Sequence, residues 1–248
     1  MSFKALVLII FIALCGTFIY LKIQINGNEN SKFNQTTRFS LGKYAWVRKI
    51  LGLHNDGDAR GWYLSPQSKL IVEVARAENV ELNKKVLGEF VRLVEIYTGK
   101  KVVLFNKETF KSGKLTEADL KEIVLAHRRY EVSSGPNLFV IYAEDFEKSG
   151  TEVARTYQEY GMVLSDKRLK EVTQRLPIAF AQYVESTMLH EFGHQLGMGH
   201  NAESDCIMNQ KVESPDENNG IFVGKFTQSD FCEFEKKQLL EIKQKFSN

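Results

Sequence analysis

Apolar and polar positions follow distinct spacings along the chain, and these spacings predict strands and helices. Lys69 to Val74 is rich in β-branched residues and predicts a strand, whereas apolar positions from Leu82 to Tyr97 recur at helical spacing and stop before Gly99. Further elements are expected as strands at Val102 to Phe105, Asn137 to Tyr142 and within Ala154 to Ser165, and as helices after a Thr116 and Asp119 capping box, over Pro177 to Gln195 and over Ser229 to Phe246. This order predicts an α+β domain with a mixed twisted sheet, a late central helix and a C-terminal helix.

The N-terminus has a different pattern. Ala5 to Leu21 is an apolar run without charge, flanked by Lys4 and Lys22, and is about as long as the shortest helix that spans a bilayer. No small-x-small cleavage site follows it, so we favour a retained transmembrane helix over a cleaved signal peptide. Cys15 leaves a lipidated N-terminus open, although a plain apolar role is simpler. Because basic residues flank both ends, the charge rule leaves the orientation open.

Polar residues dominate between Asn26 and Ser40, which is typical of a tether. We therefore expect a membrane anchor at residues 1–25, a linker at residues 26–60 and one folded domain at residues 61–248. The 33 basic and 31 acidic residues give a net charge of +2, too balanced to predict a nucleic-acid partner. The expected partner on this evidence is a membrane, bound through the N-terminal helix, and the oligomeric state stays open.

The segment HEFGHQLGMGH, which starts at His190, carries the candidate chemistry. On a helix, His190 and His194 lie one turn apart on the same face, so both imidazoles can bind one ion. Gly197 can take the left-handed conformation that ends a helix, and Gly199 loosens the same turn, so His200 can fold back as a third ligand. Three protein ligands with one open position are typical of catalytic zinc, and we expect one Zn²⁺ ion here.

Glu191 directly follows the first of these histidines. This position suits a general base that takes a proton from water and passes it to the leaving amine. The motif therefore predicts a zinc-dependent peptidase that hydrolyses a peptide or protein substrate. The alternative is a catalytically silent, zinc-holding binding or adhesion module; a closed structural zinc site is disfavoured because such a site needs no carboxylate. His54 and His127 lie outside the motif and are not expected to bind the metal.

The extended motif, with the CIM segment that ends at Met208, resembles the metzincin superfamily of zinc peptidases. The resemblance implies a metzincin-like fold in which Met208 packs in a tight turn beneath the zinc. The spacing is most similar to that of archaemetzincins, where a Cys stands two residues before the turn Met, as Cys206 does here. The Gly161 to Ser165 segment looks similar as well. Neither Asn209 nor Gln210 is a tyrosine, so the extra tyrosine ligand of some metzincins is not expected.

Two positions depart from the archaemetzincin pattern. Asn201 stands where these proteins have a Cys after the third His, and Glu235 stands where they complete a C-x-x-C pair that begins here at Cys232. We therefore predict that their second, structural zinc is absent or weakly bound. Cys206 and Cys232 then form either one disulfide or two free buried thiols. The anchor and the missing thiolates together favour a single-pass membrane protein whose catalytic domain is extracytoplasmic.

The resemblance also implies how the substrate lies. In metzincins an extended substrate runs along an edge strand above the cleft. Tyr160 to Ser165 is our candidate for that strand, and the alternative for these residues is the core of the sheet.

Overall fold

The chain forms two compact units, Met1–Asn55 and Asp56–Asn248. The computed structural model describes residues 3–25, 33, 41, 45–51, 57–129, 135–147, 152–174, 177–203, 205–209 and 228–246. Most of the predicted linker and the loop after Met208 lie outside these residues.

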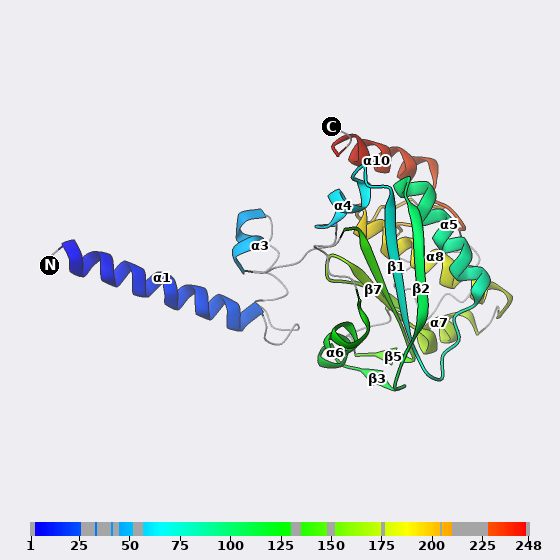
Figure 1. The fold of residues 1–248 in the computed structure, drawn as a ribbon, viewed down its shortest axis with the longest axis horizontal. Helices are drawn as coiled ribbons and strands as arrows, with labels where there is room; N and C mark the ends of the chain where they lie inside the picture. Colours follow the sequence, from blue (N-terminus) through cyan, green and yellow to red (C-terminus); the bar gives the residue numbers. More distant parts are fainter. Residues whose placement is uncertain are drawn as a thin grey trace. The chain divides into compact units, whose positions relative to one another are not determined.

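The first unit contains the long helix α1 (Phe3–Ile25) and the short helix α3 (Ala45–Leu51) (Figure 1). Within α1, Lys4–Gln24 is long and apolar enough to cross a membrane, with a mean hydropathy of 2.5 over its apolar window. At about 1.5 Å per residue, a helix of this length roughly matches the apolar core of a bilayer. A signal sequence has the same properties, so this helix is weak evidence for an anchor. The apolar pattern did not predict α3, whose Val47 and Leu51 are buried within this unit.

The second unit is built on a five-stranded sheet in the order β2-β1-β4-β7-β6 (Figure 1). Its strands are β1 (Lys69–Ala77), β2 (Lys101–Phe110), β4 (Asn137–Ala143), β6 (Ala154–Tyr157) and β7 (Gly161–Ser165). β6 pairs antiparallel with β7 at one edge, whereas the other neighbours pair in parallel. Two short strands, β3 (Lys114–Leu115) and β5 (Asp145–Phe146), form a separate parallel pair. The predicted mixed sheet is confirmed.

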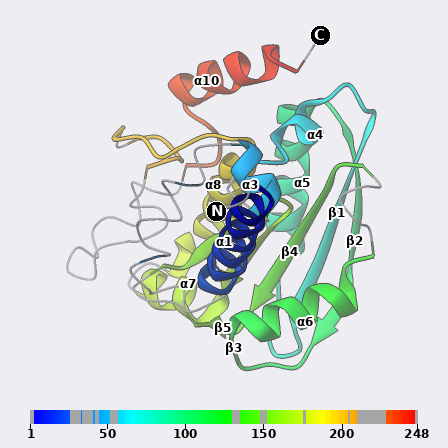
Figure 2. The same cartoon turned by 90° about the vertical axis from the view of Figure 1, so that its left-hand side faces the viewer.

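Helices pack on this sheet and at both of its ends. α5 (Lys84–Thr98) and α8 (Phe180–Gln195) lie side by side against the sheet, and α7 (Asp166–Thr173) contacts α8. Figure 2 shows α10 (Glu233–Gln244) and α4 (Arg60–Leu64) at one end of the sheet, and α6 (Glu117–His127) with β3 and β5 at the other. Every residue of β4 is buried, as expected for a central parallel strand covered on both faces.

Local signals in the sequence set several element boundaries. The Asn83 side chain accepts a hydrogen bond from the backbone nitrogen of Lys85 at the start of α5, and the helix ends at Gly99 with a φ of 71°. The predicted capping box of Thr116 and Asp119 is present at the start of α6. The predicted helix end at Gly99 and the predicted capping box are confirmed, and both depend on residues only a few positions apart.

The proposed edge strand is wrong. β7, which covers most of Tyr160 to Ser165, lies between β4 and β6 and is buried along its whole length. The alternative, the core of the sheet, is the observed position. β6 and β7 pair antiparallel, and β6 lies at the edge of the sheet while β7 lies between β6 and β4. Strand order depends on long-range pairing that the local apolar pattern does not encode.

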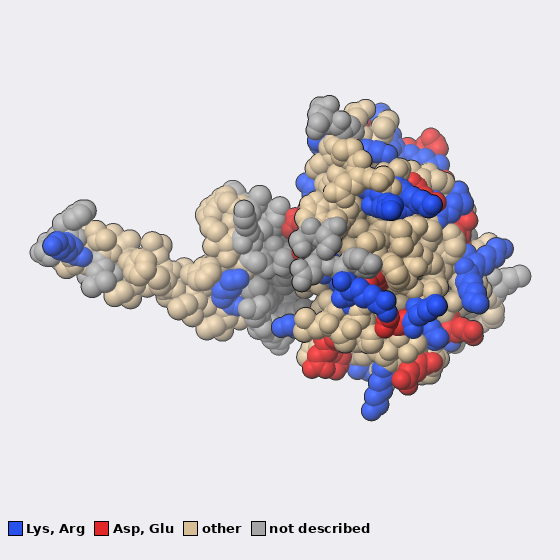
Figure 3. Space-filling view, viewed as in Figure 1, with Lys and Arg blue, Asp and Glu red and all other residues tan. Residues whose placement is uncertain are grey.

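Charged side chains of both signs are mixed on the visible face of the second unit (Figure 3). On the face of the second unit drawn in Figure 3, Lys and Arg are interspersed with Asp and Glu. The same figure shows α1 as an uncharged body with basic side chains near its two ends. This distribution agrees with the balanced net charge and with an apolar N-terminal helix flanked by Lys4 and Lys22.

Candidate metal centre

Helix α8 presents two different faces. His190 and His194 are one turn apart and are buried, with 0% and 8% of their surface exposed. Phe192, between them in sequence, lies in the core instead and makes edge-to-face contacts with Tyr63 and Phe90, at ring-centroid distances of 5.8 and 6.0 Å. The aromatic core therefore fixes the helix that carries both imidazoles.

A glycine turn ends this helix where the motif predicts it. Gly197 has a φ of 87°, its backbone nitrogen donates to the carbonyl of His194 at 2.9 Å, and the nitrogen of Met198 donates to the carbonyl of Gly193 at 3.0 Å. These two bonds form a Schellman motif. A Cβ atom at Gly197 would also stand 2.6 Å from Cδ of Arg60. The predicted helix-ending role of Gly197 is confirmed.

The turn brings His200 to the two histidines of the helix. The Nε2 atom of His194 lies 3.1 Å from Nε2 of His190 and 3.1 Å from Nε2 of His200, and the remaining Nε2 pair is 3.2 Å apart. Tetrahedral ligands at the usual zinc–nitrogen distance have nitrogens about 3.3 to 3.4 Å apart. The structure thus gathers the three predicted ligands into a cluster whose size fits one zinc ion.

The hydrogen bonds of these rings orient their lone pairs inward. Nδ1 of His190 donates to the carbonyl of Ile207 at 2.6 Å, and Nδ1 of His194 donates to the carbonyl of Met198 at 3.0 Å. A carbonyl only accepts, so in the neutral rings each Nδ1 carries the hydrogen and each Nε2 presents a lone pair. Two lone pairs that face each other repel, and a cation between them removes the repulsion. The donor set therefore fits a metal ion.

The cluster is closed on one side and open on the other. Glu191 is fully buried on α8, whereas His200 is exposed to solvent. A catalytic zinc site keeps an accessible position for water or substrate, while a structural site surrounds its ion with protein ligands. The exposure of His200 therefore agrees better with a catalytic site.

Met208 packs against the backbone of α8. It is fully buried, and a Cβ atom at Gly193 would collide with its sulfur and stand 3.1 Å from the methyl carbon of Met198. The absent side chain of Gly193 thus makes room beside α8 for the side chains of Met208 and Met198. The predicted packing of Met208 agrees with this arrangement. Sequence reasoning assigned no role to Gly193, and its signal was only a glycine inside a helix.

Gln195 is a second residue that the sequence analysis missed. Its side chain is fully buried, and Nε2 donates to the carbonyls of Gln158 at 3.0 Å and of Gly161 at 2.7 Å. It joins α8, directly after His194, to the turn between β6 and β7. A polar residue inside an apolar motif signals such a bond, because buried polar groups are hydrogen-bonded, but the sequence does not name the partner.

Tyr160, in the same turn, stacks with Arg128, the residue that follows α6. The guanidinium of Arg128 lies 3.7 Å from the ring centroid of Tyr160, and its Nε donates to Oδ1 of Asn137 at 2.9 Å. Burial raises the pKa of Tyr160, and the positive charge of Arg128 partly opposes this rise. The tyrosine therefore stays neutral near pH 7 and offers its ring face to the cation.

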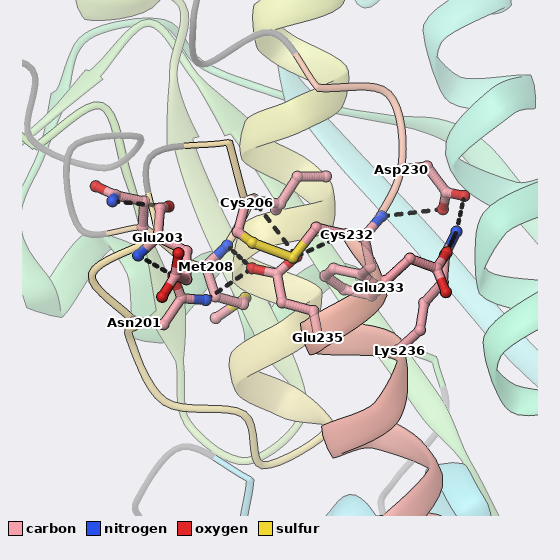
Figure 4. The surroundings of a disulfide bond; sticks show 12 residues. Asn201, Glu203, Cys206, Met208, Asp230, Cys232, Glu233, Glu235 and Lys236 are labelled. Atoms are coloured by element: carbon pink, nitrogen blue, oxygen red, sulfur yellow. Dashed lines mark hydrogen bonds and ion pairs between the residues drawn. A yellow bond between two sulfur atoms is a disulfide. The ribbon is translucent and has the colours of Figure 1, made fainter.

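Cys206 and Cys232 form a disulfide (Figure 4). Their Cα atoms are 5.2 Å apart, and the bond joins the turn before Met208 to the residue that precedes α10. The disulfide decides between the two alternatives left open by the sequence. It also uses both sulfurs, so neither is available as a thiolate ligand for a second zinc.

Replacing Cys206 and Cys232 together with serine is expected to lower the free energy of unfolding by about 2 to 4 kcal/mol. The bond closes a loop with a sequence separation of 26, and its loss gives the unfolded chain more freedom. Equilibrium denaturation checks this, with Cys15→Ser, at a free and exposed thiol, as the control. Equal stability of the double variant and the control would show that the disulfide does not stabilise the fold.

His54 and His127, the two remaining histidines, lie outside the motif. Nδ1 of His127 lies 3.3 Å from a carboxylate oxygen of Glu108, away from the cluster. His54 lies outside the described residues. That neither histidine binds the metal stays a prediction.

A sequence profile of the matrixin family of peptidases matches residues 80–234, which is more than half of the chain. The chain belongs to the matrixin family. The match contains every residue of the histidine cluster and of the turn at Met208. The expected resemblance to metzincin zinc peptidases is therefore confirmed.

Solved structures of two peptidases are similar to this matrixin in fold. An archaemetzincin from Methanopyrus kandleri has a TM-score of 0.52 and 15% identity, with 72% of this chain and 98% of that chain covered. A zinc-dependent peptidase from Methanocorpusculum labreanum has a TM-score of 0.49 and 15% identity, with 68% and 99% covered. No curated protein sequence matches significantly. The archaemetzincin structure shows a shared fold, and membership of the matrixin family supports a zinc-dependent metallopeptidase.

Proposed function

We propose that this matrixin hydrolyses peptide bonds at one catalytic zinc site, with His190, His194 and His200 as the ligands and Glu191 as the general base. The observation that carries the proposal is the convergence of three Nε2 atoms within 3.1 to 3.2 Å, two of them with lone pairs oriented by carbonyl acceptors. The open side at His200 supports catalysis over storage of a structural ion.

The chain's own residues supply orientation and proton transfer. A zinc ion held by the three imidazoles would supply Lewis-acid chemistry, which activates a water molecule and polarises the scissile carbonyl. Glu191 accepts the proton of the attacking water and passes it to the leaving amine. Ile207 and Met198 hold the rings of His190 and His194 through their carbonyls.

We further propose that the substrate is a peptide or protein that reaches the histidine cluster from the side where His200 is exposed. Gln195 supports this side of the site, because it ties the β6–β7 turn to α8 immediately after His194.

The N-terminal helix leads to a proposal for location. We propose that α1 anchors the chain as a single-pass membrane protein and that the catalytic unit lies outside the cytoplasm. The apolar length of α1 supports the anchor, and the Cys206–Cys232 disulfide supports an oxidising compartment.

Zinc removal tests the function. The purified full-length protein is expected to contain about one zinc ion per chain and to cleave members of a mixed peptide library. A chelator should abolish cleavage and added Zn²⁺ should restore it, because in the proposed mechanism the water molecule is activated only when zinc is bound. Metal analysis and mass spectrometry of the products measure both. Zinc binding without cleavage of any peptide would favour a silent binding module, and absence of zinc would contradict the metal site itself.

A further inference from the structure

Glu235, in the first turn of α10, is a fully buried carboxylate. It accepts hydrogen bonds from Nδ2 of Asn201 at 3.0 Å and from the backbone nitrogens of Ile207 at 3.2 Å, Met208 at 2.5 Å and Cys232 at 3.0 Å. Burial of a charge is costly unless such bonds replace its hydration. Bonds to an ionised acceptor are stronger than neutral ones, so this carboxylate holds its donors firmly.

The donors come from three separate parts of the chain (Figure 4). Asn201 directly follows His200, Met208 lies in the turn beneath the cluster, and Cys232 precedes α10. The backbone nitrogen of Asn201 also donates to the carbonyl of Met208 at 2.9 Å. The carboxylate of Glu235 therefore fixes the backbone that follows the third histidine against the methionine turn.

The same bonds reach the first histidine. The backbone nitrogen of Ile207 donates to Glu235, and the carbonyl of Ile207 accepts the Nδ1 hydrogen of His190 at 2.6 Å. One residue thus links the buried carboxylate to the ring orientation of His190. Since Asn201 adjoins His200, two of the three histidines depend on the position of segments held by Glu235.

We propose that Glu235 is a positioning residue for the zinc site and that it performs this task without a second metal ion. The inference rests on the proposed zinc binding by the histidine cluster. The Cys206–Cys232 disulfide keeps the methionine turn near α10, and the carboxylate sets the orientation of the backbone groups between them. Glu235 therefore has a role of its own at the position where the archaemetzincin pattern has the second Cys of a C-x-x-C pair.

Replacing Glu235 with glutamine tests this role. Glutamine has nearly the same volume, but its NH₂ group faces backbone N–H donors and leaves at least one of them unsatisfied. The zinc dissociation constant of the full-length protein, measured by competition with a chromophoric chelator, should rise about 10- to 100-fold. Glu233→Gln is the matched control, because its side chain is in the same helical turn and is 93% exposed, and it should leave zinc affinity unchanged.

A spectroscopic readout separates positioning from a general loss of stability. The visible spectrum of the Co²⁺-loaded protein reports ligand geometry, and it should change in Glu235→Gln but not in Glu233→Gln. Circular dichroism of both variants checks that the fold is retained.

A milder variant keeps the test decisive if Glu235→Gln does not fold. Asn201→Ala removes one bond to the carboxylate and leaves the three backbone bonds, so it should weaken zinc binding less than Glu235→Gln but measurably. Wild-type zinc affinity in the variants that fold would overturn the role of Glu235. Failure of the wild-type protein to bind zinc would instead contradict the proposed metal site, so the two outcomes are distinguishable.

Discussion

Replacement of Glu191 with glutamine is expected to lower kcat/KM for peptide hydrolysis about 100- to 10,000-fold while zinc content stays at the wild-type level. The amide has nearly the shape of the carboxylate but cannot accept the proton of the attacking water. His190, His194 and His200 are unchanged, so the metal site persists. Product formation from a peptide identified in the library, together with metal analysis of the same sample, measures both quantities.

Glu185→Gln is the control for this experiment. Glu185 is on the same helix, but its electrostatic neighbours are Glu89, Arg92 and Lys85 at the α5 side, so it should retain full activity. Equal turnover by the Glu191 variant and wild type would sink the proposed mechanism. Equal loss in both variants would point to damage of α8 rather than to loss of a base.

Truncation of Phe192 to alanine is expected to lower the free energy of unfolding by about 3 to 5 kcal/mol. Phe192 is fully buried and contacts the rings of Tyr63 and Phe90, so the truncation leaves a cavity between α8, α5 and α4. This loss is a large fraction of the about 5 to 15 kcal/mol by which a domain is stable. Equilibrium denaturation of the metal-free protein measures it without a contribution from bound zinc.

Phe234→Ala is the matched control for this prediction. Phe234, on α10, is 56% exposed, so its removal should change stability by no more than about 0.5 kcal/mol. A similar small effect for Phe192→Ala would contradict the view that the aromatic core fixes the ligand-bearing helix. A large stability loss with unchanged zinc affinity of the folded fraction would separate the core contacts from the metal site.

Features that depend on neighbours along the chain were predictable. The capping box of Thr116, the helix end at Gly99 and the left-handed turn at Gly197 each need residues only a few positions apart, and the structure contains all three. The central strand β4 was predictable because an unbroken apolar run suits a strand buried on both faces.

Features that depend on partners far along the chain were not predictable. The local pattern of β7 does not show that β6 takes the edge, and that order contradicts the expected substrate strand. Gln195 binds the β6–β7 turn, and Glu235 binds segments about 30 positions earlier in the chain; neither partner is visible in the sequence. The pairing of Cys206 with Cys232 was one of two open alternatives until their positions were known.

The sequence by itself predicted the candidate chemistry of this matrixin: three imidazoles, a carboxylate and a helix-ending glycine lie within eleven residues, where helical spacing and one local glycine turn relate them. The tertiary structure decided what surrounds that chemistry, including the edge strand, the disulfide and the buried carboxylate of Glu235. The reason is physical, because helical spacing and caps arise from local backbone geometry, whereas sheet order and buried hydrogen bonds arise from packing between distant segments.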